Sequence, residues 1–323
     1  MINLMLTPCT EAPHPPASAH VPFELDASLR APEAWISPKF LYDALGSKLF
    51  ESICELPEYY PTRTEAGIFT RHGAEIARRA GTGATLIDLG AGNCAKAARL
   101  FPLLHPAQYV ALDISTEFLT ESLERLRQHF AHIEMSALGI DFSGDFDLPD
   151  TVRDEKRLFF YPGSSIGNFS PDEARAFLRR LRLQCGDDGG LLIGIDLVKE
   201  HAALDAAYDD ALGVTAAFNR NVLRHVNYLL GADFDVRQWR HLGFFNADAG
   251  RVEMHLQART RQTVRWPGAM RSFAEGERIH TENSYKYTEA AAVALLAESG
   301  FAATRVWTDP RHWFAVIHAQ AAG

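Results

Sequence analysis

Acidic residues and glycines meet at the end of one apolar run, in a pattern that suits a ligand bound between a strand and a helix. Leu86-Ile87-Asp88-Leu89 leads directly into Gly90-Ala91-Gly92, and an amphipathic segment follows. In such a turn the glycines let the backbone approach a ligand at the start of the helix. The next apolar run ends in Asp113, an acid placed to accept hydrogen bonds from ribose hydroxyls. These residues predict a site for a cofactor that contains adenosine.

The chemistry depends on Asp88, because the glycines alone do not separate hydride transfer from methyl transfer. An anion two residues before Gly90 would repel a pyrophosphate, whereas it would attract a sulfonium or an amino group. A cationic methionine derivative therefore suits the turn better than NAD. Asp141 and Phe142 follow the third candidate strand, in a place that lies beside the adenine in methyltransferase-like folds. The simpler alternative for Asp113 and Asp141 is a helix cap or turn acid.

A second cluster, Gly163-Ser164-Ser165-Ile166-Gly167-Asn168, follows the fourth candidate strand. Open sheets of parallel strands place ligand chemistry at the carboxyl ends of their strands. The two glycines permit close approach of the backbone, and Asn168 offers both a hydrogen-bond donor and an acceptor. The alternative for Asn168 is a cap on the helix that begins at Pro171.

Strands and helices alternate from Thr85 onward, which predicts a parallel sheet covered by helices on both faces. The expected strands are Thr85–Leu89, Gln108–Leu112, Ile133–Ile140, Leu158–Tyr161 and Leu191–Asp196, and the expected helices cover 94–104, 115–130 and 171–184. Nearer the N-terminus, apolar spacing predicts one helix from Ser37 to Leu56 and another over about 64–80. Between these two helices Glu58-Tyr59-Tyr60-Pro61 predicts an aromatic turn.

The alternation breaks after Asp196. Residues 200–230 predict two helices, and 239–264 predict antiparallel strand, because apolar and polar residues alternate from Val252 to Arg259. Thr288–Ser299 predicts a helix, and 302–308 with 312–318 predict a hairpin that completes the first sheet.

The fold class expected is therefore α/β, with a Rossmann-like cofactor domain and a second, α+β domain; the family resemblance described below implies that the first is a methyltransferase domain and that the second binds the substrate. The first would comprise 61–196 plus 287–323, and the second 21–60 plus 197–286. Residues 1–20 are expected to be a flexible tail.

Composition excludes several classes of protein. The chain has 323 residues and a net charge of −9, which argues against nucleic acid as the main partner. No apolar run approaches the roughly 20 residues that span a bilayer, and the N-terminus does not have the pattern of a signal peptide. We therefore expect a cytoplasmic protein, with a monomer favoured, that acts on a small molecule.

Neither the cysteines nor the histidines predict a metal site. The four cysteines form no C-x-x-C pair and suit a reducing compartment: Cys9, Cys54, Cys94 and Cys185. His129, His132 and Glu134 have no convincing further ligand beside them, so we expect no metal.

Several segments from about residue 35 to the C-terminus together resemble one family. They are Pro57–Arg63, Asp88–Gly92, Gly163–Asn168, Asp196–Lys199, Ala207–Asp210, Thr215–Asn221 and Thr281–Lys286. On these segments the chain resembles histidine-specific Nα-methyltransferases of ergothioneine biosynthesis. The resemblance implies S-adenosylmethionine as methyl donor, L-histidine as acceptor and Nα,Nα,Nα-trimethylhistidine (hercynine) as product. The chain departs from the family pattern at Ala91 and Asn93, where small hydroxyl residues are expected.

The resemblance also implies which residues bind each ligand. The amino and carboxylate groups of histidine would meet Asn168, Tyr208 and one tyrosine of the Tyr59-Tyr60 pair, with Tyr42 nearby. The imidazole would meet Glu282 and Ser284, between walls that include Phe218 and Met254. The candidate catalytic residues are Asn168, Tyr59 and Tyr60, and the sequence leaves open which tyrosine faces the substrate. The candidate cofactor site comprises Asp88, Gly90, Gly92, Lys96, Asp113, Asp141, Phe142 and Gly163.

Other functions stay open on the residues alone. The same fold and methyl donor could serve another aromatic amino acid, although Glu282 speaks against that. A protein that binds a nucleotide-like ligand without turnover is a further alternative, and an NAD dehydrogenase is disfavoured by Asp88. The simpler alternatives are a core residue for Met254, which its spacing alone favours, a core tyrosine with a satisfied hydroxyl for Tyr208, and a solvated turn acid for Glu282.

Overall fold

The larger sheet of the molecule has seven strands in the order β12-β13-β6-β5-β2-β3-β4. The structure is a computed structural model that describes residues 20–114, 116–142 and 144–322. The strands are β2 (Thr85–Leu89), β3 (Gln108–Asp113), β4 (Glu134–Gly139), β5 (Arg157–Tyr161), β6 (Gly190–Asp196), β12 (Phe301–Thr308) and β13 (Phe314–Ala321). Strands β2 to β6 are parallel, and β13 runs antiparallel to both β6 and β12. This order is Rossmann-like, so the five predicted strands and the closing hairpin are confirmed.

Alternate residues of the buried strands point to opposite faces of this sheet and enter two different cores. Leu86 and Leu158 belong to one core, whereas Ile87 and Phe159 belong to the other. The first core is covered by α3 (Tyr60–Ala80), α4 (Ala95–Ala98), α5 (Phe101–Leu104) and α6 (Thr116–His129), and the second by α7 (Pro171–Cys185) and α10 (Glu289–Glu298). Helices on both faces explain why the strands read as continuous apolar runs.

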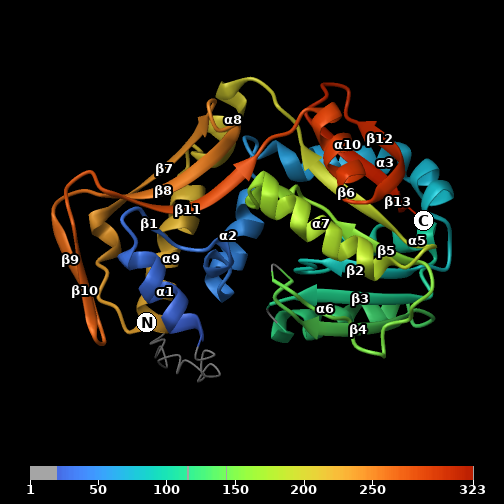
Figure 1. Ribbon diagram of the computed structural model, residues 1–323, viewed down its shortest axis with the longest axis horizontal. Helices are drawn as coiled ribbons and strands as arrows, with labels where there is room; N and C mark the ends of the chain where they lie inside the picture. Colours follow the sequence, from blue (N-terminus) through green and yellow to red (C-terminus); the bar gives the residue numbers. More distant parts are fainter. Residues whose placement is uncertain (1–19, 115, 143, 323) are drawn as a thin grey trace, which may run out of the picture.

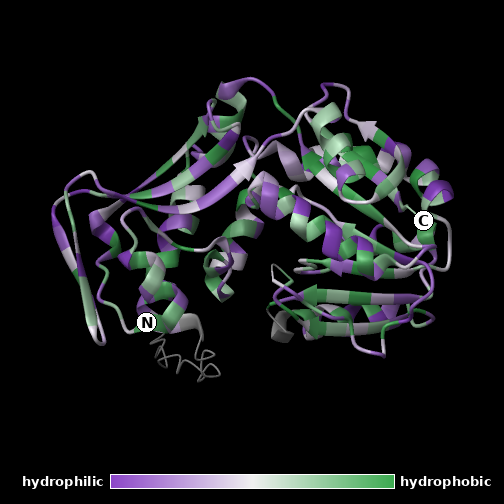
Figure 2. Ribbon diagram, viewed as in Figure 1, coloured by the Kyte–Doolittle hydropathy of each residue, from purple (hydrophilic) through white to green (hydrophobic). Residues whose placement is uncertain are grey.

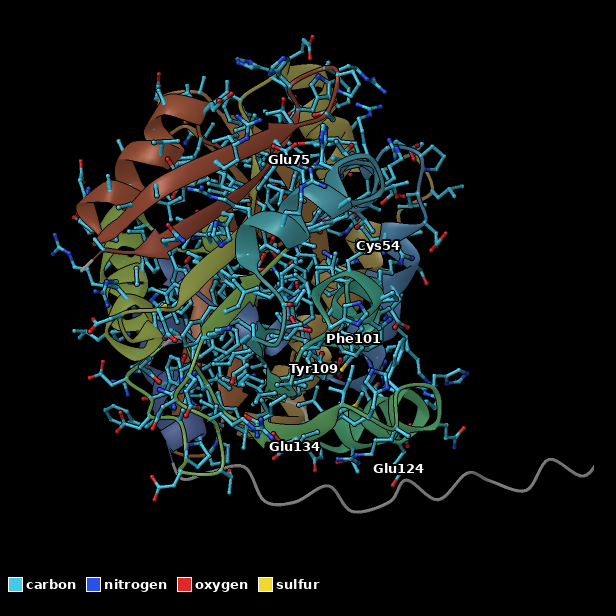
Figure 3. All side chains as sticks on the ribbon, turned by 90° about the vertical axis from the view of Figure 1, so that its right-hand side faces the viewer. Cys54, Glu75, Phe101, Tyr109, Glu124 and Glu134 are labelled. Atoms are coloured by element: carbon cyan, nitrogen blue, oxygen red, sulfur yellow. The ribbon has the colours of Figure 1, made fainter. Side chains whose placement is uncertain are left out.

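The figures show this burial directly. Hydrophobic colour gathers along the strands of the larger sheet and on the inward sides of its helices (Figure 2). Phe101 and Tyr109 lie inside the molecule with ring centroids 4.9 Å apart, whereas Glu124 and Glu134 are exposed near its edge (Figure 3).

A second, four-stranded sheet lies beside the first, in the order β1-β11-β8-β7 (Figure 1). Its strands are β1 (Ala34–Trp35), β7 (Trp239–Asn246), β8 (Arg251–Ala258) and β11 (Arg278–Tyr285). A third core joins it to α1 (His20–Arg30), η1 (Pro38–Leu41), α2 (Ala44–Cys54), α8 (His201–Tyr208) and α9 (Val214–Leu230). The remaining elements are the ribbon of β9 (Gln262–Trp266) and β10 (Ala269–Phe273) and the short helices η2 (Ser165–Asn168) and η3 (Val236–Gln238).

The helix predicted from Ser37 to Leu56 is wrong, because the chain turns at Asp43 and forms η1 and α2 instead. The Asp43 carboxylate caps α2 by accepting a hydrogen bond from the backbone N–H of Gly46 (2.7 Å). A Cβ at Gly46 would lie 1.8 Å from the carbonyl oxygen of Leu41, so only glycine permits this close turn.

Three other predicted segments differ in their bounds. The helix predicted over 64–80 begins at Tyr60, which places the expected aromatic turn at a helix start. The helix predicted over 94–104 is split into α4 and α5, since Pro102 cannot donate the backbone hydrogen bond that would continue it. The region 239–264 holds β7, β8 and the start of β9, whereas the two helices predicted over 200–230 are confirmed.

The chain passes between the two sheets three times. It enters the larger sheet's side at Tyr60, leaves it after Asp196 and returns at Tyr287. The second and third passages lie side by side, because Leu197 and Tyr287 form a parallel bridge and the Val198 N–H donates to the Tyr287 carbonyl (3.0 Å). The two-domain division stays a prediction, and residues 1–19 of the expected tail lie outside the described residues.

Candidate active site

A cavity of about 1260 Å³ lies between the carboxyl ends of the parallel strands and the elements of the second sheet. It is lined by residues from both sides. The predicted site residues that line it are Tyr42, Tyr59, Asp88, Gly90, Gly92, Lys96, Asp113, Asp141, Phe142, Gly163, Asn168 and Glu282. The residues predicted for the cofactor and part of those predicted for the substrate therefore share one cavity.

The glycine turn at the cavity wall is fastened to β3. Gly90 and Gly92 have φ values of 70° and 51°, in the left-handed region that favours glycine. The backbone N–H of Gly90 donates to the Leu112 carbonyl (2.9 Å), and that of Gly92 donates to the Asp113 carboxylate (3.0 Å). Asp113 thus holds the turn in shape at the place where it also faces the cavity.

Asp88 places a buried carboxylate behind this turn. Its Oδ2 accepts a hydrogen bond from the Tyr109 hydroxyl (2.8 Å), whereas its buried Oδ1 has no partner among the described residues. Burial raises the pKa of Asp88 to about 7, although the Tyr109 hydrogen bond opposes that rise. An oxygen left without a partner costs free energy, which a bound cation or N–H group would recover. This environment suits a cationic cofactor and disfavours a pyrophosphate.

Glu65 is a site residue that the sequence analysis missed. It is 1% exposed on α3, and its carboxylate accepts from Lys96 Nζ (2.9 Å) and from the backbone N–H of Gly163 (2.7 Å). It therefore ties together two residues predicted to bind the cofactor. The available signal was its spacing, because Glu65 falls on the buried face of α3 with Pro61 and Ile68.

The far end of the cavity carries an ion pair between its two walls. Asp141, which follows β4, lies 3.4 Å from Nζ of Lys39 on η1, and Lys39 also pairs with Glu24 at 2.8 Å. Beside Asp141, the Phe142 ring packs edge-on against Tyr161, with centroids 6.1 Å apart. An acid and an aromatic ring thus stand together at this end of the cavity.

The other end of the cavity presents polar groups without a hydrogen-bond partner in the part of the chain that the structure describes. The hydroxyls of Tyr42 and Tyr59, the side-chain amide of Asn168 and the carboxylate of Glu282 make no hydrogen bond with any residue that the structure describes. Asn168 is not the cap of α7, because Ser170 forms a complete capping box there with Glu173. Burial holds the pKa of both tyrosines well above 10, so their hydroxyls stay protonated. Unpartnered groups of these types can receive a polar ligand.

Glu282 is the carboxylate among these groups. It is 8% exposed and follows a bulge in β11, where the register against β8 shifts between His280 and Glu282. Burial raises the pKa of its carboxyl to about 7, and the nearby charge of Lys286 only partly opposes this. Near neutral pH this carboxylate is ready to accept a hydrogen bond from a ligand.

The structure turns the two adjacent tyrosines in opposite directions. Tyr59 lines the cavity, whereas the hydroxyl of Tyr60 donates to Oδ2 of Asp196 (2.6 Å) on the other side. Arg63 fixes this arrangement, because its guanidinium donates to the carbonyls of Tyr59 and Leu56, each at 3.1 Å. Tyr60 is therefore part of a buried polar cluster and does not line the cavity.

Four other predicted substrate residues lie just behind the cavity wall. Phe218 packs on Tyr42 with ring centroids 5.5 Å apart, and Tyr208 packs on Tyr59 at 6.2 Å. Met254 is buried on β8, directly opposite Glu282 in the sheet register. Ser284 is buried and accepts a hydrogen bond from the Tyr208 hydroxyl (2.8 Å).

Metal ligands do not gather within the described chain. No group of three or more His, Cys, Asp or Glu residues in the described ranges has the arrangement of a metal site. Cys54, Cys94 and Cys185 are free thiols there, while Cys9 lies outside those ranges. Among the described helices, none is long and apolar enough to cross a membrane.

Comparison with known proteins identifies the family. A model of the histidine-specific, S-adenosylmethionine-dependent methyltransferases matches residues 22–321. The chain belongs to this family. It therefore uses S-adenosylmethionine, and the buried, acidic and glycine-lined end of the cavity suits that cationic methyl donor.

Individual members of this methyltransferase family are similar over most of the chain. The histidine N-alpha-methyltransferase of Mycolicibacterium smegmatis is 42% identical over 296 residues, covering 89% of this chain and 90% of the relative. That of Mycobacterium tuberculosis is 40% identical, covering 85% and 86%. Ergothioneine biosynthesis protein 1 of Neurospora crassa is 33% identical over 83% of this chain, which spans 31% of that longer protein.

Proposed function

We propose that this enzyme transfers three methyl groups from S-adenosylmethionine to the α-amine of L-histidine and so produces hercynine for ergothioneine biosynthesis. The observation that carries the choice of acceptor is the buried carboxylate of Glu282, which faces the cavity and makes no hydrogen bond with any described residue. An imidazole ring offers an N–H to such a group. The names of the similar proteins from the two mycobacterial species and from Neurospora crassa support the same reaction.

The residues at this end of the cavity suit an amino acid whose amine must react as a neutral base. Tyr59 and Asn168 can hydrogen-bond the amine and carboxylate without adding a fixed charge beside the amine. A free α-amine has a pKa of roughly 8, and a partly dry pocket favours its neutral form. The aromatic rings of Tyr42 and Tyr59 also tolerate the cation that forms, as aromatic rings do around quaternary ammonium groups.

Methyl transfer to this amine is an in-line displacement. S-adenosylmethionine supplies a methyl group on a positively charged sulfur. The amine nitrogen forms a bond to the methyl carbon as the carbon–sulfur bond breaks, and the amine proton passes to solvent before the next round. The contribution of the protein is alignment, which can supply about 7–11 kcal/mol in favourable cases. We propose that Asn168 and Tyr59 provide it, and that Asp88, Asp113 and the glycine turn hold the methyl donor.

The test of this function is a competition among acceptors. The purified enzyme is incubated with S-adenosylmethionine and an equimolar mixture of free amino acids, and the products are separated and identified by mass spectrometry. We expect mono-, di- and trimethylated histidine and no methylation of the other amino acids. Methylation of another amino acid in preference to histidine would refute the assignment.

We further propose that the protein is a cytoplasmic monomer whose partner is the free amino acid, with no nucleic acid or membrane involved. The net charge of −9 supports this, because a surface that binds nucleic acid or anionic lipid is usually basic. Sedimentation of the purified enzyme with and without RNA tests the proposed state.

A further inference from the structure

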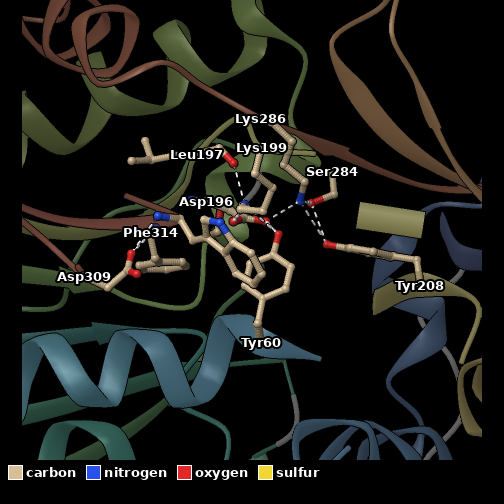
Figure 4. A network of polar contacts seen from close by, with 11 residues as sticks. Tyr60, Asp196, Leu197, Lys199, Tyr208, Ser284, Lys286, Asp309 and Phe314 are labelled. Atoms are coloured by element: carbon tan, nitrogen blue, oxygen red, sulfur yellow. Dashed lines mark hydrogen bonds and ion pairs between the residues drawn. The ribbon is translucent and has the colours of Figure 1, made fainter. Parts of the chain in front are cut away.

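A buried charged cluster lies behind the acceptor end of the cavity (Figure 4). Its centre is Asp196, which is fully buried at the end of β6 and pairs with Lys199 at 2.5 Å and with Lys286 at 2.8 Å. Tyr60 donates to the same carboxylate. The cluster thus holds two lysines against the buried carboxylate of Asp196, and the charge of Asp309 also acts on Lys199.

Lys286 uses all three of its protons inside this cluster. It pairs with Asp196, and it donates hydrogen bonds to Oγ of Ser284 (2.7 Å) and to the hydroxyl of Tyr208 (3.2 Å). Burial opposes the charge, but the attraction of Asp196 outweighs it, and the pKa of Lys286 lies above its ordinary value of 10.5. The protonated Lys286 therefore donates a hydrogen bond to each of these two hydroxyl oxygens, those of Ser284 and Tyr208.

The direction of the Ser284 proton follows from these contacts. The Ser284 oxygen accepts from Lys286 and also from the Tyr208 hydroxyl (2.8 Å), which occupies both of its lone pairs. Its own proton has to point to a further acceptor, and no residue that the structure describes accepts it. Ser284 lies on the same side of β11 as Glu282, because side chains two residues apart in a strand share a face.

We propose that Lys286 is a positioning residue for substrate recognition, which forces Ser284 to act as a hydrogen-bond donor toward the ring of the acceptor. This inference rests on the proposed function. With Ser284 held as a donor and Glu282 as an acceptor, the two residues match an aromatic ring that has one bare nitrogen and one N–H. A neutral imidazole is such a ring. A phenyl ring offers neither group, and an indole offers no bare nitrogen.

The chain contains a matched control for this role. Lys199 is a second buried lysine on the same carboxylate, but its other contacts are the Tyr60 hydroxyl (2.7 Å) and the Leu197 carbonyl. It touches neither Ser284 nor Tyr208. Lys199→Met therefore removes a lysine from the same carboxylate without releasing the two hydroxyls, whereas Lys286→Met removes a lysine and releases both hydroxyls.

The experiment compares wild type, Lys286→Met and Lys199→Met in the full-length enzyme. Steady-state KM and kcat for histidine are measured, and the Kd for S-adenosylhomocysteine is measured by calorimetry as a test of the folded cofactor site. We expect Lys286→Met to raise the histidine KM at least about tenfold, as loss of a charged hydrogen bond implies, with the Kd for S-adenosylhomocysteine unchanged. Lys199→Met should leave the histidine KM within about threefold of wild type.

A second comparison distinguishes a positioning role of Lys286 from a general disturbance of the structure. In a Ser284→Ala, Tyr208→Phe background, Lys286→Met should change the histidine KM by less than about threefold, because its targets are gone. The proposal would be overturned if Lys286→Met raised the histidine KM as much in that background as in wild type, or if Lys286→Met and Lys199→Met raised it equally. If Lys286→Met does not fold, Lys286→Gln is tested in its place. If neither Lys286 variant folds while Lys199→Met does, Lys286 has a role in stability alone and the proposal is refuted. A wild-type enzyme inactive on histidine would instead refute the proposed function.

Discussion

Glu282→Gln should weaken histidine binding while it stabilises the free protein. The substitution keeps the size of the side chain but removes the ionisable group. The Glu282 carboxylate is 8% exposed and makes no hydrogen bond with a described residue, so only the nearby charge of Lys286 offsets its burial until a ligand binds. Loss of a hydrogen bond to a charged partner costs about 1.5–3 kcal/mol, which corresponds to about a 10- to 150-fold rise in the histidine KM.

The gain in stability follows from the sign of the pKa change. Burial raises the pKa of Glu282 from 4.5 to about 7, so the folded state binds this proton more tightly than the unfolded state does. The ionised carboxylate therefore opposes folding. This cost grows, and the stability of wild type falls, as the pH rises from about 4.5 to about 7, and both are constant above that range. At about 1.4 kcal/mol per pH unit, the difference corresponds to about 3 kcal/mol. The glutamine variant, which cannot ionise, escapes this cost at alkaline pH.

Two measurements test the pair of effects. Urea unfolding of wild type and Glu282→Gln should give a more stable variant at about pH 8 and nearly equal stabilities at about pH 4.5. In steady-state assays the ratio of the histidine KM values should shrink below about pH 7, where wild-type Glu282 takes up a proton in the empty site. The affinity for S-adenosylhomocysteine serves as the control and should not change. A variant that is less stable at pH 8, or whose histidine KM lies within twofold of wild type, would refute the reasoning.

Four further substitutions separate the roles of neighbouring residues. Tyr59→Phe should raise the histidine KM by about 2- to 12-fold without loss of stability. Tyr60→Phe should instead lower the free energy of unfolding by about 1–3 kcal/mol, because it leaves the buried Asp196 carboxylate short of a hydrogen-bond donor. If steady-state kinetics and urea unfolding give the reverse pattern, Tyr60 and not Tyr59 lies at the substrate. Glu65→Gln should weaken S-adenosylhomocysteine binding about tenfold in calorimetry, because it breaks the ion pair that orders Lys96, and an unchanged affinity would count against that link. Asp113→Ala should likewise weaken S-adenosylhomocysteine binding at least about tenfold, and a rise confined to the histidine KM would contradict its assignment to the cofactor.

The strands β2, β3 and β6 could be predicted closely because each is a largely apolar run that ends in an acid or directly before a glycine. Thr85–Leu89 is observed with the predicted bounds. The helix from Ser37 failed because its apolar spacing continues across the break at Asp43. That break depends on a distant residue, since Asn221 of α9 donates to the same Asp43 oxygen that caps α2 (2.7 Å). Helical periodicity carries no information on such a contact.

In the cavity, the residue types could be predicted better than their directions. The choice between Tyr59 and Tyr60 depends on a hydrogen bond from Tyr60 to Asp196, which is 136 residues away in the sequence. Lys286 was missed although a signal existed. A strand that presents Glu282 and Ser284 on one face presents Lys286 on that face too, and a lysine on a buried face needs a partner.

The three passages of the chain between the sheets have a consequence for engineering. They occur at Tyr60, after Asp196 and at Tyr287, and residues of the Asp196 cluster flank every one of them. Each of the three connections between the larger sheet, which binds the methyl donor, and the second sheet, on the acceptor side, is therefore held by the charged cluster around Asp196. A graft that exchanges residues 21–59 and 200–285 between relatives, and keeps Tyr60, Asp196, Lys199 and Lys286, would change the acceptor side while leaving its anchor intact. Such chimaeras would let new amine substrates be explored on an unaltered S-adenosylmethionine site.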